Sequence, residues 1–353
     1  MTDTSLTDGS AHGLKYLFKD KPEKGEIREI AEGVLWLRLP LFKGLDHINV
    51  WLLEDTDGWI IVDTGLNNDA TKEVWEQVFD QTLNGKPVSK VIVTHMHPDH
   101  VGLAGWLCEK FDAPLYMSRL EYLTCRMLSA DTGQPAPDEA LRFLREIGST
   151  PELIENYKQR FGGFGMAIYR LPQSYIRLSQ GEEIEINGRI WQIEMGNGHS
   201  PEHICLHCPS LKLLISGDQV LPRISSHVGI FPNEPEANNM QDWIDSCHRL
   251  IERLPSDLLV LPAHNEPFYG IHERLQSLID GHERRLARLL ELCRTPRHPN
   301  DAEIFSTLFR RQIDADTFIM AATESMAHLN CLQRRGKLSK QLDENGVLIF
   351  ASI

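Results

Sequence analysis

The 353-residue sequence has no long hydrophobic run. No stretch approaches the roughly 18 consecutive apolar residues that a membrane-spanning helix needs, so we expect no membrane partner. The first 25 residues are polar and charged and lack the apolar core of a signal peptide. We therefore expect a cytoplasmic protein.

Positive charge is also scarce. The chain has 36 Lys and Arg against 50 Asp and Glu, a net charge of −14. Nucleic-acid binding relies on clustered cations that displace counterions, so this balance disfavours a nucleic-acid partner, although a local basic channel can exist in an acidic protein. The most basic stretch, residues 272–297, carries six arginines against four acids. We interpret it as a solvated helix face.

A disulfide framework is not expected either, because the seven cysteines are scattered and odd in number. Cys205 and Cys208 form a C-x-x-C pair, a spacing also found in zinc and redox sites. No second pair accompanies it. We interpret residues 203–208 as a strand that returns through a sheet.

A short run at residues 94–100, T-H-M-H-P-D-H, holds four side chains of metal-binding type: His95, His97, Asp99 and His100. The preceding residues 91–93 are apolar and β-branched, which predicts a buried strand, and residues 101–107 have helical spacing. The run therefore lies between the end of a strand and the start of a helix, where open α/β sheets place their sites. Polar groups crowded in this way are costly to bury without a ligand, so we predict a metal site.

This run resembles the metal-binding signature of the metallo-β-lactamase fold superfamily, and other segments resemble its further motifs in the same order. Residues 59–65, W-I-I-V-D-T-G, are similar to the first motif, and the resemblance gives Asp63 the role of orienting the metal loop by hydrogen bonds. Residues 191–203 are similar to the third motif. There the resemblance implies that His199 binds metal and that His203 supports the site.

Two later segments extend the resemblance. Residues 213–218, L-L-I-S-G-D, end a predicted strand in Asp218, and residues 258–265, L-L-V-L-P-A-H-N, end another in His264. The resemblance implies two adjacent metal sites that share Asp218 as a bridge. The ligands implied for the first site are His95, His97 and His199, and those for the second are Asp99, His100 and His264.

The resemblance implies two divalent metal ions as cofactors. Zinc is favoured, and iron or manganese is also compatible with these ligands. A water held between two such metals becomes a hydroxide nucleophile near neutral pH, and Asp99 is the candidate to accept its proton. The complete second ligand set favours hydrolysis, because persulfide dioxygenases of this fold use a single iron and lack that set.

Alternating strand and helix patterns predict an α/β fold, and the resemblance specifies a four-layer αββα sandwich. We expect an N-terminal extension over residues 1–26, a catalytic domain over 27–297 and a winged-helix-like C-terminal domain over 298–353. The superfamily branch with the mitochondrial lactamase-like ribonuclease and its thioesterase-like relatives has this arrangement. Residues 301–353 carry seven acids and six Lys or Arg. We therefore expect this unit to pack on the catalytic domain or to form a homodimer, not to bind DNA.

An insertion over residues 119–172 separates the metal loop from the third motif. Three of its segments have helical spacing, at residues 121–128, 138–147 and 151–161. Its position suits a lid over the site, with glycines as hinges. Four side chains near its end either line an apolar substrate pocket or pack the insertion onto the core: Phe161, Phe164, Met166 and Tyr169.

Two further polar residues follow Asp218 closely in the sequence. Arg223 and His227 are candidates to bind a substrate carboxylate or phosphate. Anchoring of their own loop is an equally good interpretation of both.

The expected function is hydrolysis of a small-molecule ester, thioester or lactone by a metal-bridging hydroxide. The alternative is a metal-dependent phosphodiesterase or endoribonuclease acting on single-stranded RNA, as the domain arrangement suggests. The insertion would narrow access for a polymer, and the acidic charge is unsuited to one. The intact ligand set disfavours a non-enzymatic binding module, and the lack of an export signal disfavours a β-lactam substrate.

Overall fold

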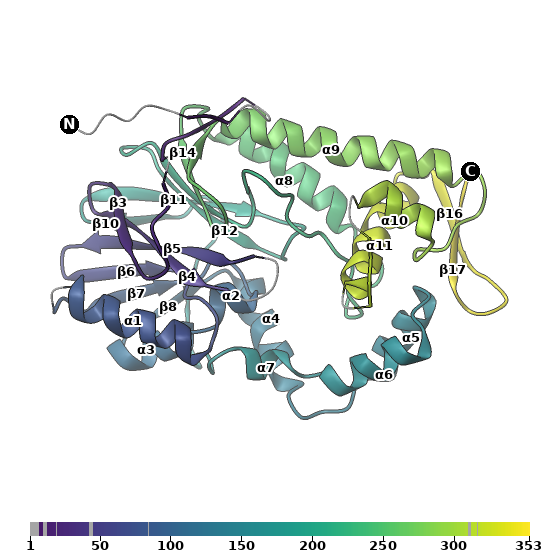
Figure 1. The fold of residues 1–353 in the computed structure, drawn as a ribbon, viewed down its shortest axis with the longest axis horizontal. Helices are drawn as coiled ribbons and strands as arrows, with labels where there is room; N and C mark the ends of the chain where they lie inside the picture. Colours follow the sequence, from purple (N-terminus) through teal and green to yellow (C-terminus); the bar gives the residue numbers. More distant parts are fainter. Residues whose placement is uncertain are drawn as a thin grey trace.

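The computed structural model describes residues 7–9, 13–18, 20–41, 45–83, 85–309, 312–315 and 317–353. In this part of the chain two β-sheets pack face to face, and helices cover both outer faces (Figure 1). This is the predicted four-layer sandwich. Apolar side chains from both sheets, including Trp36, Trp51, Trp191 and Ile215, fill the space between them.

The first sheet has the strand order β3-β4-β5-β6-β7-β8-β9. Its strands are β3 (Ile27–Ala31), β4 (Val34–Pro40), β5 (His47–Asp55), β6 (Gly58–Val62), β7 (Val88–Ile92), β8 (Leu115–Met117) and β9 (Ile176–Arg177). Strands β3 to β6 pair antiparallel, and β6 to β9 pair parallel. In β4, Trp36 faces the second sheet while Leu35 and Leu37 face the helices, which explains why this strand is apolar at successive positions.

The second sheet has the order β1-β2-β15-β14-β13-β12-β11-β10. Its strands are β1 (Thr7–Gly9), β2 (Leu14–Tyr16), β10 (Glu183–Ile186), β11 (Arg189–Gly196), β12 (His203–Cys208), β13 (Leu213–Gly217), β14 (Leu259–Pro262) and β15 (Phe268–Tyr269). Strands β13 and β14 are parallel neighbours. Strand β2 pairs with β15, and Leu14 and Tyr16 are buried, so the described part of the predicted extension 1–26 joins this sheet.

The predicted strand over residues 203–208 is β12. Along this strand Cys205 faces the helical layer, whereas Cys208 faces the first sheet, because alternate side chains point to opposite faces. The C-x-x-C pair therefore does not converge on a common site. All seven cysteines are buried and free.

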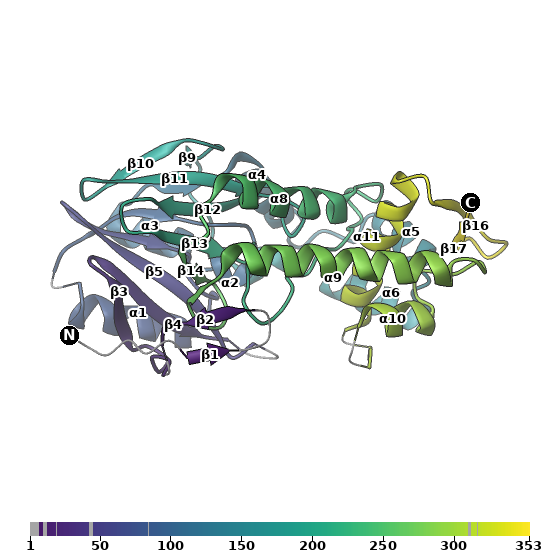
Figure 2. The same ribbon diagram turned by 90° about the horizontal axis from the view of Figure 1, so that it is seen from above.

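Each outer face of the sandwich is covered by two helices. Helices α1 (Asp69–Gln81) and α3 (Ala104–Phe111) pack on the first sheet, and α8 (Asn239–Arg253) and α9 (Ile271–Leu292) pack on the second. Helix α9 has 22 residues and extends beyond the sandwich toward the C-terminal end of the chain (Figure 2). None of the helices in the described ranges is long and apolar enough to span a bilayer.

The insertion forms four helices: α4 (Arg119–Ala130), α5 (Asp138–Glu146), α6 (Pro151–Arg160) and α7 (Phe164–Ala167). The first three lie where helical spacing predicted them. They leave the sandwich and reach the C-terminal part of the chain (Figure 1). Phe143 and Leu144 of α5 share a core with that part, and the Asn300 amide donates a hydrogen bond to the Gly148 carbonyl at 2.9 Å. The far end of the insertion is thus anchored.

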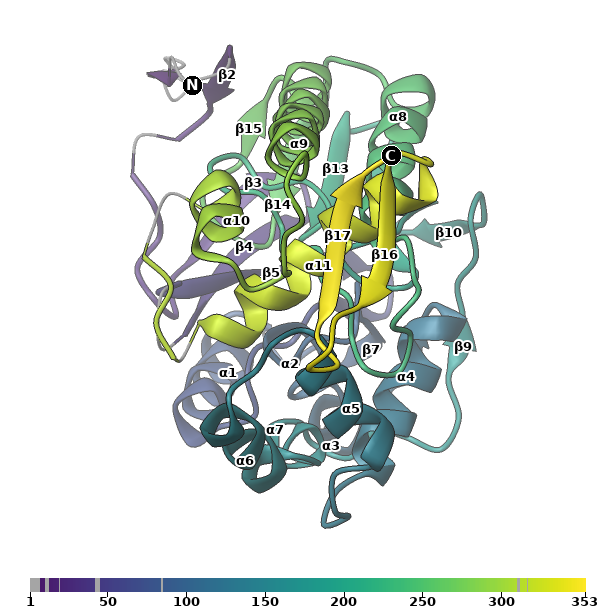
Figure 3. The same ribbon diagram turned by 90° about the vertical axis from the view of Figure 1, so that its right-hand side faces the viewer.

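The C-terminal residues form two helices and a hairpin, in the predicted order. They are α10 (Ala302–Leu308), α11 (Phe318–Arg334), β16 (Leu338–Leu342) and β17 (Leu348–Ser352). Figure 3 shows the hairpin at the end of the molecule, beside α11 and above α5. Phe350 of the hairpin and Met326 of α11 belong to the same buried core as α8 and α9. This unit therefore packs on the catalytic part, which was one of the two arrangements expected from the sequence.

Candidate metal centre

The seven predicted metal ligands lie in segments that follow the carboxyl ends of strands in both sheets. Hydrogen bonds hold these ends together, since the Ile204 amide donates to the Thr94 carbonyl at 2.8 Å and the Ala263 amide donates to the Gly217 carbonyl at 3.0 Å. Asp99 and His100 lie in a short helix, α2 (Pro98–Val101), and not on the loop itself. The structure brings all seven together in two adjacent groups: His95, His97, His199 and Asp218, and then Asp99, His100 and His264.

The first group has the spacing of metal ligands. His95 Nε2 lies 2.8 Å from His97 Nδ1 and 3.3 Å from His199 Nε2. His199 Nε2 lies 3.4 Å from Asp218 Oδ2. Ligands about 2.1 Å from a tetrahedral zinc ion are about 3.4 Å from one another. Two of the three separations match this value and the third is shorter, so the four atoms converge closely enough to hold one ion.

The second group lies against the other oxygen of Asp218. Asp218 Oδ1 is 3.4 Å from His264 Nε2 and 3.5 Å from His100 Nε2, and Asp99 Oδ2 is 3.5 Å from His264 Nε2. Asp218 thus offers one oxygen to each group. Among the described residues, His100 Nε2 and Asp218 Oδ1 are buried without a hydrogen-bond partner. Such atoms are costly unless something binds them, so the residues fit a second ion.

The opposite nitrogens of three ligand imidazoles are held by the protein. His100 Nδ1 donates to Asp63 Oδ2 at 2.7 Å, His199 Nδ1 donates to the His227 carbonyl at 2.7 Å, and His264 Nδ1 donates to the His47 carbonyl at 2.9 Å. These bonds turn each Nε2 toward the centre and select the tautomer that can bind a metal.

Asp63 also holds the start of the metal loop. Its Oδ1 accepts the Thr94 amide at 2.8 Å, and its Oδ2 accepts the Thr94 hydroxyl at 2.8 Å. Asp63 has a φ of 63°, a left-handed conformation that Asp tolerates better than most residues. These contacts are those expected of the orienting role that the sequence suggested.

His203 belongs to neither ligand group. Its Nε2 accepts the Asp218 amide at 3.0 Å, and its ring stacks on His95 with centroids 4.7 Å apart. Gly217, which precedes Asp218, has a φ of 50°, and a Cβ at this position would lie 2.5 Å from His203 Cε1. His203 therefore contacts the loop that presents Asp218.

Glu121 is a buried residue of the site that the sequence did not identify. Its carboxylate accepts the Met96 amide at 2.8 Å, the Ser200 hydroxyl at 2.7 Å and the Glu202 amide at 2.8 Å. It thus joins the first insertion helix to both the metal loop and the loop of His199. Burial raises the pKa of Glu121, while these hydrogen bonds oppose that rise. Glutamate is common in the first turn of a helix, so nothing in the sequence marked this one.

The charges around the two groups differ. Burial and the surrounding histidines hold the pKa of His95 well below its usual value, so this imidazole is neutral and ready to bind. Burial also lowers the pKa of His100, but Asp63, Asp99 and Asp218 outweigh it and raise that pKa well above the usual value. A metal ion bound by His100 would therefore compete with a proton.

A cavity of about 1190 Å³ adjoins the first group and has His97 and His199 in its wall. Most of the remaining wall is apolar and comes from the metal loop, the insertion, the segment after Asp218 and the C-terminal unit: Met96, Leu120, Met127, Leu128, Phe143, Leu144, Tyr157, Phe161, Phe164, Phe231 and Ile319. Carboxylates predominate among its charged side chains: Asp131, Glu139, Glu234, Asp242 and Asp245, against Arg249. The cavity therefore suits an apolar group better than a polyanion.

Two of the four predicted apolar contacts line this cavity. Phe161 and Phe164 do so, whereas Met166 is 73% exposed and lies outside it. The Tyr169 hydroxyl donates to Glu109 at 3.0 Å, also away from the cavity. Phe164 and Met166 are two positions apart in the short helix α7, so their side chains point to different sides of that helix.

Arg223 and His227 do not line the cavity either. Arg223 Nε pairs with Glu266 Oε2 at 2.8 Å, and its guanidinium lies 4.5 Å from the Tyr16 ring centroid. His227 Nδ1 lies 3.1 Å from Glu324 Oε2. Both side chains anchor their own loop in this structure, which was one of the two interpretations.

Comparisons with known proteins agree with this geometry. The family model of the metallo-beta-lactamase superfamily matches residues 44–264. A second model, the metallo-beta-lactamase-like C-terminal domain, matches residues 286–353 and so begins within α9, before the predicted boundary at residue 298. The first match alone covers more than half of the chain.

Similar proteins span most of the chain. The human acyl-coenzyme A thioesterase MBLAC2 is 24% identical over 68% of this chain and 81% of its own. A Bacillus subtilis protein described as "Probable metallo-hydrolase YqjP" is 21% identical over 90% of this chain and 97% of its own. The crystal structure of a beta-lactamase domain protein from Burkholderia ambifaria is 38% identical, with a TM-score of 0.88 over 97% of this chain and 99% of that one. The chain therefore belongs to the metallo-beta-lactamase superfamily and is a hydrolase of that family.

Proposed function

We propose that this protein is a dinuclear metal-dependent hydrolase of small-molecule thioesters, esters or lactones with an apolar acyl group. One observation carries the proposal: two ligand groups share Asp218 beside a largely apolar cavity. Two bound divalent ions, for which zinc suits these ligands, would supply an activated water and polarise the scissile carbonyl.

The residues of the chain prepare the site for that chemistry. Burial raises the pKa of the Asp99 carboxyl, but His100 and His264 outweigh it and lower that pKa to about 2. Asp99 is thus ionised at neutral pH, and its side chain is 23% exposed, more than that of Asp218. It can accept a hydrogen bond from the attacking water and so orient it, and it is our candidate to receive the water's proton.

The cavity supports an apolar substrate of considerable size. Its volume of about 1190 Å³ exceeds the range of roughly 300–1,000 Å³ that is usual for small-molecule sites. The aromatic side chains Tyr157, Phe161 and Phe164 can hold an acyl chain or ring. The name of the human relative makes a thioester the first substrate to test. The carboxylates at the cavity disfavour RNA, the alternative substrate.

The proposal is tested by metal analysis combined with a substrate panel of acyl thioesters, lactones and a bis-aryl phosphodiester. We expect two metals per chain and hydrolysis of the carbonyl substrates. Asp99→Ala and His264→Ala should lower turnover by about 100-fold or more and reduce the metal content, because each removes a ligand of the second group. Met166→Ala, outside the cavity, is the control. Unimpaired turnover with one metal per chain, or a clear preference for the phosphodiester, would overturn the proposal.

A further inference from the structure

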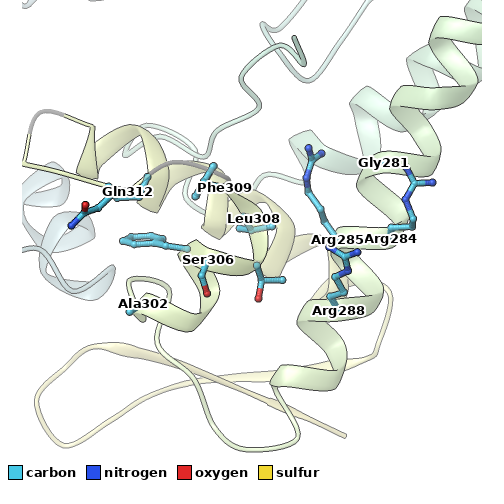
Figure 4. A pocket seen from close by; sticks show the side chains of 12 residues that line it. Gly281, Arg284, Arg285, Arg288, Ala302, Ser306, Leu308, Phe309 and Gln312 are labelled. Carbon is cyan, nitrogen blue, oxygen red and sulfur yellow. The ribbon is translucent and has the colours of Figure 1, made fainter. Parts of the chain in front are cut away.

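The second half of α9 borders another cavity, of about 850 Å³, on the side of the helix that faces α10. Three arginines of α9 line it, Arg284, Arg285 and Arg288 (Figure 4). The opposite wall is formed by Ala302, Phe305, Ser306, Thr307, Leu308, Phe309, Gln312 and Ile313. None of its lining residues belongs to the cavity at the metal ligands. It is therefore a separate site.

Two of these arginines, Arg284 and Arg288, have unpaired charges among the described residues. Within the described ranges, neither Arg284 nor Arg288 has a carboxylate within 4.0 Å. The two nearest glutamates of α9, Glu283 and Glu291, pair with other arginines. Arg284 and Arg288 are one helical turn apart, and like charges at that spacing repel. In a chain with a net charge of −14, such a cluster is explained best by an anionic ligand.

The opposite wall is aromatic and apolar. It includes Phe305 and Phe309, whose ring centroids lie 6.1 Å apart, together with Leu308. Gln312 also lines the cavity, and its amide has no hydrogen-bond partner in the described part of the chain. The site thus combines guanidinium groups with ring faces and one free amide.

This combination identifies a class of ligand. Guanidinium groups bind phosphate oxygens in pairs, and several of them together suit a group with more than one phosphate. Aromatic side chains stack on a planar ring. We propose that the cavity between α9 and α10 binds a phosphorylated nucleoside, either as a free nucleotide or as the nucleotide end of a coenzyme. The volume lies within the usual range for small-molecule sites, roughly 300–1,000 Å³, and suits a small molecule better than a polynucleotide.

Calorimetric titration of the metal-loaded protein with ADP and with coenzyme A tests this proposal independently of any hydrolytic activity. We expect at least one of them to bind, and Arg284→Ala/Arg288→Ala to weaken that binding by at least about tenfold, because hydrogen bonds to charged groups are lost. Arg294→Ala is the matched control, since Arg294 pairs with Glu291 outside the cavity. Binding of ADP alone identifies a free nucleotide as the ligand, and binding of coenzyme A with the same arginine dependence identifies the coenzyme.

Other outcomes would overturn the proposal. The proposal is wrong if neither compound binds, or if the double variant binds them as tightly as the wild type does. It is also wrong if pyrophosphate binds as tightly as ADP. Competitive inhibition of hydrolysis by ADP that the arginine substitutions do not change would place the nucleotide at the metals instead. Single-stranded RNA that binds more tightly than ADP and loses affinity in the double variant would identify a polynucleotide. Because the titration measures binding and not hydrolysis, its result does not depend on whether the hydrolase proposal is correct.

Discussion

Glu121 connects three segments that are far apart in the sequence. It lies 25 residues from Met96 and about 80 residues from Ser200 and Glu202, yet it accepts a hydrogen bond from each. Two of these segments carry ligands of the first metal group. The position of His97 relative to His199 therefore depends on a residue that touches neither metal group.

We expect Glu121→Ala to weaken metal binding by about 10- to 100-fold, the usual effect of removing a group that orients ligands. It should also lower stability, since each buried donor left unpaired costs roughly 1–3 kcal/mol. Glu121→Gln keeps one acceptor oxygen, so its metal affinity and stability should lie between those of the wild type and Glu121→Ala. Metal competition with a chromophoric chelator and thermal unfolding measure the two effects.

The control for Glu121 is Glu155→Ala, because Glu155 is 58% exposed on α6, where it pairs with Lys158. An unchanged metal affinity in Glu121→Ala would show that the loops are held without this carboxylate.

The residues predicted from the sequence share one property. His95, His97, Asp99 and His100 are close in sequence, and each remaining ligand follows its own apolar strand, so a local pattern was sufficient to find them. Glu121 offered no such pattern, because its partners come together only in the folded chain. The outward direction of Met166 depends on its place in the short helix α7, which the spacing of apolar residues did not reveal.

At the level of secondary structure, the insertion forms one wall of the cavity beside the metal ligands and is attached at its far end. Its helices α4, α5 and α6 were predicted from helical spacing, because α4 and α5 each bury one side and α6 packs Ile154 and Tyr157 partly buried against the core. The short elements β2, β15 and α7 were not predicted, since segments of two to four residues depend on the neighbours with which they pair. The spacing of apolar residues likewise predicted that α5 has an apolar face, but it did not show that this face packs on the C-terminal unit.

We expect Phe161→Ala and Phe164→Ala to raise KM for long apolar acyl substrates by about tenfold or more, because burying an aromatic side chain contributes roughly 1.5–3 kcal/mol. Short acyl substrates should be affected much less, since they do not reach these rings. Met166→Ala, seven-tenths exposed on the same segment, should behave as the wild type. Steady-state kinetics over a series of acyl chain lengths measures the difference, and a uniform change at every length would argue against a cavity wall.

In the whole molecule, the C-terminal unit is joined to the catalytic part through buried histidines. His282 of α9 lies 3.1 Å from the Ser225 hydroxyl and 3.2 Å from His328 of α11, whose Nδ1 donates to the Glu324 carbonyl at 2.9 Å. Ser225 belongs to the loop that follows Asp218. Burial, His328 and Arg285 hold the pKa of His282 well below its usual value of 6.5.

This arrangement predicts a loss of stability in acid. Below about pH 6.5 the unfolded chain protonates His282 while the folded chain does not, so the free energy of unfolding falls as the pH falls, by at most about 1.4 kcal/mol per pH unit for one group. His282→Gln should lose stability at neutral pH but show a shallower decline between about pH 7.5 and pH 5.5. Chemical unfolding at saturating metal measures this, with the exposed His248→Gln as control. Parallel pH profiles for wild type and His282→Gln would contradict the prediction.

The arrangement of whole units was the least predictable part of the structure. The arginines of α9 were interpreted as a solvated helix face, and Arg284 and Arg288 are indeed exposed. Nothing in the sequence showed that Phe305, Leu308 and Phe309 form the other wall of a cavity beside them. The order of helices and hairpin at the C-terminus was foreseen, but not the contact between Asn300 and Gly148 that closes the unit onto the insertion.

Because every cysteine is buried, alkylation of the cysteines can report local unfolding of the protein. Burial raises the pKa of Cys108 to about 12 and raises that of Cys205 further, and a thiol is alkylated only as the thiolate. The folded chain should therefore resist alkylation, while an opened segment becomes labelled. Cys125 marks the insertion, Cys208 the core between the sheets and Cys331 the C-terminal unit. Mass mapping of the labelled positions would thus reveal the order in which these parts come apart.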